Sequence, residues 1–143
     1  MANQPITHKF VAVVNKKVST GAAMNALAHL AAGLAASYVK PELMRFDDYH
    51  DKDGGIHSAV SDNPFIILRA DNSNKLRALR AELLVAGVHF NDFTSTMTSG
   101  SYVEQQERTS QTPESELEYY AVCMFGEIET LNPLTKKFSL WRD

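Results

Sequence analysis

The sequence predicts an α/β fold in three layers, with a mixed sheet of four or five strands and helices on both faces. Two observations carry this prediction. Short runs of β-branched and other apolar residues recur along the chain, and segments with a helical spacing of apolar residues separate them. Strands that are apolar along their whole length belong in a sheet covered on both faces, and alternation with helices builds such a sheet.

The first strand is expected over residues 8–15, which include five consecutive apolar residues. A helix follows from Ser19 or Thr20 to about Tyr38, and either hydroxyl can cap its first turn. Alanine and leucine occupy nearly all of its sides, so we expect it to be buried on most of them. The helix ends before Pro41, because a residue that precedes proline avoids the helical region.

A β-hairpin is expected next. Residues 44–49 and 56–60 have strand character, and the polar turn 50–55 between them ends in two glycines. The aspartates of this turn and His57 suggest a metal loop, but placing Gly54 at the required glycine of a calcium loop puts Tyr49 at the first ligand. The turn is therefore preferred, and no metal site is expected.

Three further elements follow in regular order. Residues 65–68 form a short apolar run of the kind found in interior strands. Asp71 or Asn72 caps a helix that continues to about Val85 and closes at Gly87. Residues 88–93 are a strand that leads into a loop rich in serine and threonine.

The C-terminal third is less regular. Residues 101–117 are polar and rich in Glu and Gln, and we expect an excursion that is helical in part. A strand over 119–126, a turn or short helix over 131–136 and a last short strand over 138–141 complete the chain. No repeat or linker divides it, so residues 1–143 are expected to form one domain.

Composition restricts the classes of function. The chain has 143 residues, of which 44% are hydrophobic and 22% charged, and its net charge is −3. A nucleic-acid-binding protein usually has a basic excess, so tRNA is disfavoured as an obligate partner. The single cysteine, Cys123, excludes an internal disulfide and is expected to be a buried, inert thiol. We find no signal peptide or membrane span, and we expect a cytoplasmic protein.

The loop between the first strand and the first helix is a candidate anion site. Lys16 and Lys17 lie beside the start of the helix, where free N–H groups and the helix dipole favour negative charge. Gly21 lets a ligand approach the backbone. The alternative is a well-capped helix that follows a strand and binds nothing.

The same segment carries a family resemblance. Lys17, Gly21 and His29 match in register the motif Lys-Met-x-x-Gly-Lys-x-Ala-Ala-Gln-x-x-His of type II peptidyl-tRNA hydrolases. Asp92 and Thr96 match the Asp-Ala-Gly-Arg-Thr segment of those proteins. The C-terminal run Leu-Thr-Lys-Lys-Phe-Ser-Leu-Trp is similar to that of an uncharacterised bacterial branch of the same superfamily. The resemblance implies the fold of that family.

The chain departs from the motif at two of its polar side chains, a lysine and a glutamine. Ala22 replaces the second lysine and Ala26 replaces the glutamine of the helix. Asn25 is adjacent, but one position along a helix rotates a side chain by about 100°. The excursion that begins at Ser101 is an insertion relative to the compact loop of the family. The resemblance therefore implies a catalytic set that is partly lost.

The resemblance also implies roles for individual residues. Asp92 and His29 would assist attack by water, and Thr96 would orient the substrate. The implied ligand-binding residues are Lys17, Ser19, Thr20, Gly21, Asn25 and Thr94. Each has an ordinary alternative: a histidine in an alanine-rich helix is usually a core residue, and an aspartate after a strand often caps a turn.

The leading hypothesis is a cytoplasmic protein that binds a small anionic ligand in a cleft between residues 17–21 and 92–96. The alternative is a hydrolase of peptidyl-tRNA or of a related ester or amide bond, with helix N–H groups stabilising the oxyanion. A third hypothesis is an interaction module that uses residues 101–118. No cofactor and no membrane contact are expected, and a homodimer is left open.

Overall fold

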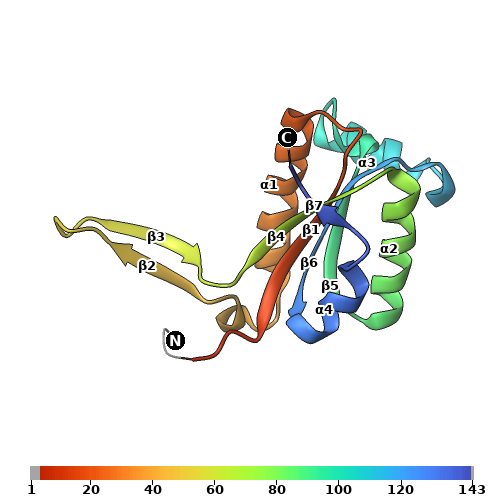
Figure 1. The fold of residues 1–143 in the computed structure, drawn as a ribbon. Coiled ribbons are helices and arrows are strands. Elements are labelled where there is room, and N and C mark those ends of the chain that lie inside the picture. Colours follow the sequence, from red (N-terminus) through yellow and green to blue (C-terminus); the bar gives the residue numbers. More distant parts are fainter. Residues whose placement is uncertain (1–3, 143) are drawn as a thin grey trace.

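The structure is a computed structural model, and it describes residues 4–142. Its centre is a five-stranded sheet in the order β5-β6-β1-β4-β7 (Figure 1). The strands are β1 (His8–Asn15), β4 (Phe65–Ala70), β5 (His89–Thr94), β6 (Tyr119–Glu127) and β7 (Ser139–Leu140). β1 and β4 are parallel, and the other neighbours are antiparallel. The predicted mixed sheet is thus confirmed.

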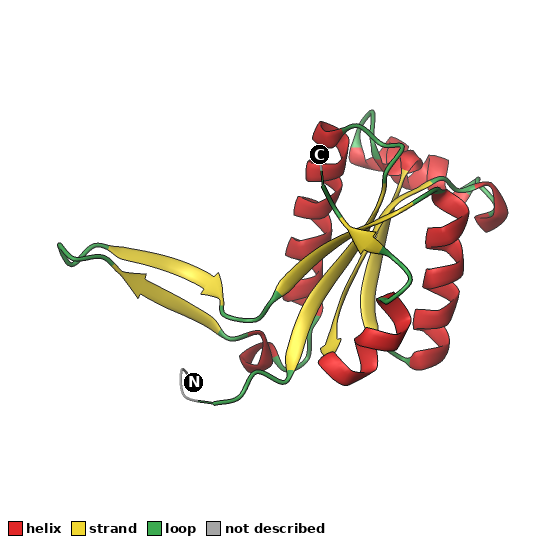
Figure 2. Cartoon of the chain, viewed as in Figure 1, coloured by secondary structure: helices red, strands yellow, loops and turns green. Residues whose placement is uncertain are grey.

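Helices cover both faces of this sheet, as Figure 2 shows. Helix α1 (Thr20–Ser37) packs on one face, against Phe10, Ala12 and Val14 of β1. Helices α2 (Ser73–Ala86) and α4 (Ile128–Thr135) cover the opposite face, where Val11 and Val13 point. Successive side chains of a strand point to opposite faces, so one apolar strand serves two cores. The three-layer prediction is therefore confirmed.

The helix boundaries follow from capping chemistry. The Ser19 hydroxyl accepts a hydrogen bond from the Ala22 N–H, and the Asn72 side chain accepts one from the Lys75 N–H. Gly87 ends α2 in a left-handed conformation, with φ of +68°. The two long helices therefore start within one residue of their predicted positions. Helix α4 starts three residues earlier than predicted, because β6 passes into it with no turn residues at the boundary.

Residues 101–117 contain helix α3 (Tyr102–Ser110), which lies beyond the end of β5 (Figure 1). Three short 3₁₀ turns complete the structure: η1 (Pro41–Met44), η2 (Ser95–Met97) and η3 (Glu114–Glu116). The expectation of an excursion that is helical in part is confirmed. Across residues 4–142, no helix has the combination of length and apolar character needed to cross a membrane.

The predicted hairpin is present as β2 (Phe46–His50) and β3 (Ile56–Ser61). It forms a separate two-stranded sheet that projects away from the rest of the molecule (Figures 1 and 2). Its turn is held by Asp51, whose carboxylate accepts hydrogen bonds from the N–H groups of Asp53 and Gly55 and lies 2.9 Å from His57 Nε2. These contacts explain why an aspartate, a glycine and a histidine occur together around this turn.

Candidate functional site

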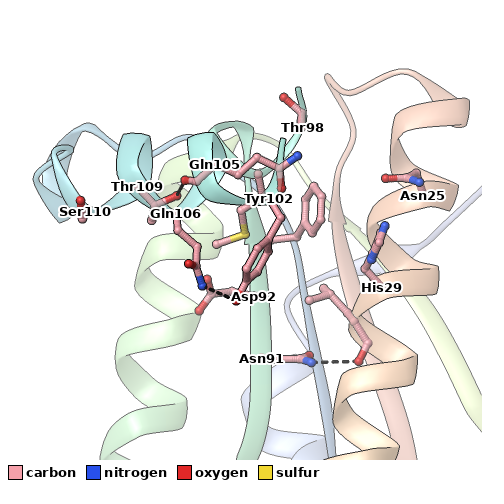
Figure 3. A pocket seen from close by; sticks show the side chains of 13 residues that line it. Asn25, His29, Asn91, Asp92, Thr98, Tyr102, Gln105, Gln106, Thr109 and Ser110 are labelled. Atoms are coloured by element: carbon pink, nitrogen blue, oxygen red, sulfur yellow. Dashed lines mark hydrogen bonds between the residues drawn. The ribbon is translucent and has the colours of Figure 1, made fainter. Parts of the chain in front are cut away.

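A pocket of about 860 Å³ lies between α1, the end of β5 and α3 (Figure 3). Helix α1 contributes Asn25 and His29, while β5 contributes Asn91, Asp92 and Phe93. The residues of α3 that line the pocket are Tyr102, Gln105, Gln106, Thr109 and Ser110. The pocket therefore sits at the edge of the sheet, because β5 is an edge strand. Its lining is a mixture of carboxamides, hydroxyls and apolar rings.

Asn91 joins β5 to α1 at the base of the pocket. Its Nδ2 donates a hydrogen bond of 2.8 Å to the Leu30 carbonyl, as drawn in Figure 3. The Oδ1 atom of Asn91 is buried, and no residue in the range 4–142 offers it a hydrogen bond. A buried acceptor without a partner costs about 1–3 kcal/mol, so a ligand donor would relieve a real penalty.

His29 projects from α1 toward the pocket (Figure 3). Its imidazole stacks on the Phe93 ring, with a centroid separation of 5.9 Å and an interplanar angle of 26°. The imidazole is exposed, and it forms no hydrogen bond with any residue in the range 4–142. Its ring nitrogens are therefore accessible to a ligand, while the face of the ring is fixed by Phe93.

Asp92 reaches the same pocket from the other face of β5. Its Oδ2 accepts a hydrogen bond of 2.9 Å from Arg80 Nε of α2, whereas Asn91 and Phe93 point toward α1. The carboxylate is thus neutralised by an ion pair. The structure brings His29 and Asp92 to one pocket, but no hydrogen bond joins them, and they extend from opposite sides of the strand.

Thr94 and Thr96 belong to a buried cluster of hydroxyl groups beneath α3. Thr94 Oγ1 and Thr96 Oγ1 are 2.6 Å apart, and Thr109 Oγ1 lies 2.8 Å from Thr96 Oγ1. The guanidinium of Arg108 donates to the Thr96 carbonyl at 3.1–3.2 Å. These bonds hold α3 over the end of β5. Both hydroxyls thus make contacts within the protein, and the roles expected of Thr94 and Thr96 toward a substrate stay predictions.

The loop with Lys17 lies outside this pocket, and so do Ser19, Thr20 and Gly21. The Lys17 N–H donates to Asn15 Oδ1 at 2.9 Å, and the Ser19 hydroxyl is used as the cap of α1. Lys16 pairs with Asp71 at 3.1 Å. The pocket thus brings together Asn25, His29 and Asp92 of the predicted residues, but not the predicted anion loop. The roles assigned to that loop stay predictions.

Sequence reasoning missed the pocket residues of helix α3, and it also missed Asn91 of β5. Gln106 Nε2 donates to the Tyr102 hydroxyl at 2.7 Å, which fixes two of these side chains relative to each other (Figure 3). A capping box starts the helix: Ser101 Oγ accepts from the Glu104 N–H, and the Glu104 carboxylate accepts from the Ser101 N–H. The Ser-x-x-Glu spacing of this box was a sequence signal that could have located the helix.

The family to which the chain belongs is decided by a sequence comparison. A family profile described as a protein of unknown function, DUF2000, matches residues 8–142. The chain belongs to the DUF2000 family. None of the curated proteins compared with it matches significantly.

A solved structure shares the fold. The protein of unknown function Atu0240 from Agrobacterium tumefaciens strain C58 is 15% identical in sequence, with a TM-score of 0.82. The match covers 96% of this chain and 100% of that one. At this identity the likeness shows the fold alone.

The assignment to a branch of the type II peptidyl-tRNA hydrolases is wrong. The DUF2000 match covers nearly the whole chain, and neither it nor Atu0240 provides a link to peptidyl-tRNA hydrolase. The resemblance rested on short segments around Lys17 and Asp92. Those segments mark a strand that leads into a loop and a helix, which many α/β proteins contain. What is shown is an α/β protein of the DUF2000 family, whose function is unknown.

Proposed function

We propose that the pocket between α1, β5 and α3 binds a small, uncharged, planar molecule whose edge carries both hydrogen-bond donors and acceptors, as a nucleobase does. The observation that carries this proposal is the gathering of carboxamides in the pocket: Asn25, Asn91, Gln105 and Gln106. A carboxamide presents two donors and an acceptor, and it pairs with a heterocycle edge through two bonds. The unpartnered Asn91 Oδ1 supplies an acceptor at the base of the pocket.

The apolar part of the lining fits the faces of such a ring. Phe93 and Leu30 are buried at the floor, while Met97 and Tyr102 border the space toward α3. Aromatic rings stack on the face of a planar heterocycle, and a thioether also packs well against an aromatic ring. A volume near 860 Å³ lies within the range typical of small-molecule sites.

Charge is the reason to prefer an uncharged ligand over the anion expected from the sequence. No lysine or arginine is among the residues that line the pocket. Among the described residues that line it, the one carboxylate is that of Asp92, which is already paired with Arg80. An anion would enter without a fixed positive partner, and burying it would carry a large desolvation cost.

Calorimetry with adenine, guanine, uracil and cytosine, each as the free base, tests this proposal. We expect at least one base to bind and to raise the melting temperature. The double variant Gln105→Ala/Gln106→Ala should weaken that binding about tenfold or more, which corresponds to about 1.4 kcal/mol. Gln111→Ala is the matched control, because Gln111 is exposed at the end of α3 outside the pocket. Binding by none of the four bases, or equal loss in the control, would contradict the proposal.

Hydrolysis of a small ester or amide bond in the same pocket is the second candidate, and the accessible imidazole of His29 favours it. A free ring nitrogen can act as a general base toward water. Turnover of neutral model esters by the wild type that falls at least about 100-fold in His29→Asn would support this activity. Equal rates in the two proteins would exclude it.

A further inference from the structure

The hairpin β2–β3 is an arm without a packing partner in the chain described. It meets the body at its root, where Asn63 Nδ2 donates to the Leu43 carbonyl at 2.7 Å and the Asp62 N–H donates to the Arg45 carbonyl at 2.9 Å. Beyond that root its strands pair with each other, away from the helices and the main sheet (Figure 1). A two-stranded hairpin alone is marginally stable in water, so an arm of this kind is expected to be covered.

The arm exposes more apolar surface than a solvated hairpin needs. Its large apolar side chains retain about half of their surface to solvent or more: Phe46 46%, Tyr49 53%, Ile56 63% and Val60 51%. Several large, exposed apolar side chains on one small hairpin indicate an interaction surface. The outer edges of both strands also lack partners within residues 4–142.

The charge of the arm is opposite to that of a groove on the body. Residues 46–61 carry four aspartates and one lysine, a net of −3, which equals the net charge of the whole chain. The groove, at the carboxyl end of β4, has a volume of about 270 Å³. Arg69, Lys75 and Lys137 line it together with Asp71. Asp71 pairs with Lys16, and Lys137 pairs with Glu82, so the cations still outnumber the carboxylates around the groove. The acidic arm and the basic groove are therefore complementary in charge.

The dimensions fit a two-fold arrangement of two copies. The arm leads directly into β4, and both are about 20 Å long, at about 3.3 Å for each of six residues. The arm extends away from β4 in roughly the direction opposite to that in which β4 runs (Figure 1). Two copies with antiparallel β4 strands would therefore place each arm tip at the carboxyl end of the other β4. That end carries the basic groove.

We propose that the chain forms a two-fold symmetric dimer in which the acidic β2–β3 arm of each copy lies against the basic groove around Arg69, Lys75 and Lys137 of the other. Such an isologous contact buries the same pair of surfaces twice. The apolar side chains of the arm supply the buried area. The charges set the orientation and make association sensitive to salt.

Sedimentation velocity of the full chain at low and high salt is the first measurement. A dimer at low salt that weakens in high salt is the expected result, and a monomer at micromolar concentrations under both conditions would overturn the proposal. Asp48→Lys/Asp53→Lys on the arm and Lys75→Glu/Lys137→Glu in the groove should each raise the dissociation constant about tenfold or more. Glu107→Lys/Glu116→Lys is the matched control for the arm variant, because it makes the same change of charge on exposed residues outside both surfaces.

Mixing the two charge-reversed proteins gives the decisive test. One arm–groove pair in the mixed dimer has both charges exchanged, so opposite charges meet again. The mixture should therefore form more dimer than either variant alone. Absence of recovery, or a dimer that persists in both variants alone, would overturn the pairing of arm with groove. Melting temperatures of the variants show whether each monomer is folded.

Discussion

Asn15 and Asn91 show how the hydrogen bonds of a single side chain distinguish a structural residue from a candidate ligand-binding residue. Asn15 is buried at the end of β1, and both ends of its carboxamide are used: Nδ2 donates to the Tyr119 carbonyl at 3.1 Å, and Oδ1 accepts from the Lys17 N–H at 2.9 Å. Asn91 uses its Nδ2 alone, and its Oδ1 is left buried. Asn15 therefore stabilises the fold, whereas Asn91 Oδ1 is the acceptor to which we assign a hydrogen bond from the proposed ligand.

Replacing Asn15 by alanine should destabilise the protein by about 1–3 kcal/mol, because the Tyr119 carbonyl and the Lys17 N–H would each lose a partner. Urea denaturation measures this change as a lower midpoint. Asn25→Ala is the control, since Asn25 is exposed on α1, and it should change the free energy of unfolding by less than about 0.5 kcal/mol. A stability loss in Asn15→Ala no larger than in the control would contradict the structural role.

Cys123 should not react with thiol reagents while the protein is folded. It is fully buried in β6, and burial raises the pKa of its thiol to about 12, so little of the reactive thiolate is present at neutral pH. Labelling with a disulfide reagent at pH 8 should follow the rate of global unfolding and become rapid in denaturant. Fast labelling of the native protein would show that β6 opens locally. The inert thiol expected from the sequence agrees with this environment.

At the scale of elements, sequence patterns located α1 and α2 well because each begins with a capping side chain and α2 ends at a glycine. The pocket was predicted only in part. Asn25, His29 and Asp92 were identified, but α3 was not located within the polar excursion, and its five lining residues were missed. A helix without any buried residue has no apolar stripe, so periodicity could not reveal it. The Ser101–Glu104 capping box was the remaining signal.

Removing that cap should loosen the wall of the pocket. Ser101→Ala is expected to destabilise α3 by about 1 kcal/mol and to speed hydrogen exchange of the amides in residues 102–110. Ser99→Ala is the matched control, because Ser99 is exposed just before the helix and its hydroxyl has no capping role. Equal exchange in the two variants would show that packing through Thr109 and Arg108, rather than the cap, maintains α3.

At the scale of the whole molecule, the order of the strands depends on contacts between distant residues. β1 lies between β4 (Phe65–Ala70) and β6 (Tyr119–Glu127), so both of its neighbours are distant from it in sequence. Local patterns gave the strands and the two covered faces, but they could not reveal that β5 is an edge or that the hairpin stands apart from the sheet. Both features matter for the proposals, since the candidate pocket lies at β5 and the arm is the proposed interface.

A polar seam also joins distant parts of the molecule, and it should make stability depend on pH at both extremes. Tyr119 of β6 donates a hydrogen bond of 2.8 Å to Glu114 Oε2 of η3, and Arg77 of α2 donates to the same oxygen at 3.0 Å. The bond from Tyr119 is the main reason why the pKa of Glu114 is lowered. Burial, followed by the bond to Glu114, raises the pKa of Tyr119 to about 12.

The directions of these two pKa shifts define the pH range over which both groups stabilise the fold. Glu114 stabilises the fold above its ordinary pKa, and this contribution is lost as the pH falls through its lowered value. Tyr119 stabilises the fold below its ordinary pKa of 10.0, and this contribution is lost as the pH rises from there to about 12. Wild type should therefore be more stable than Tyr119→Phe between these limits, and the difference should shrink above pH 10. Glu114→Gln should likewise reduce the fall in stability on the acid side. Urea midpoints measured across the pH range test both expectations, and a constant difference between wild type and Tyr119→Phe from pH 7 to pH 12 would show that the tyrosine proton does not contribute to the seam.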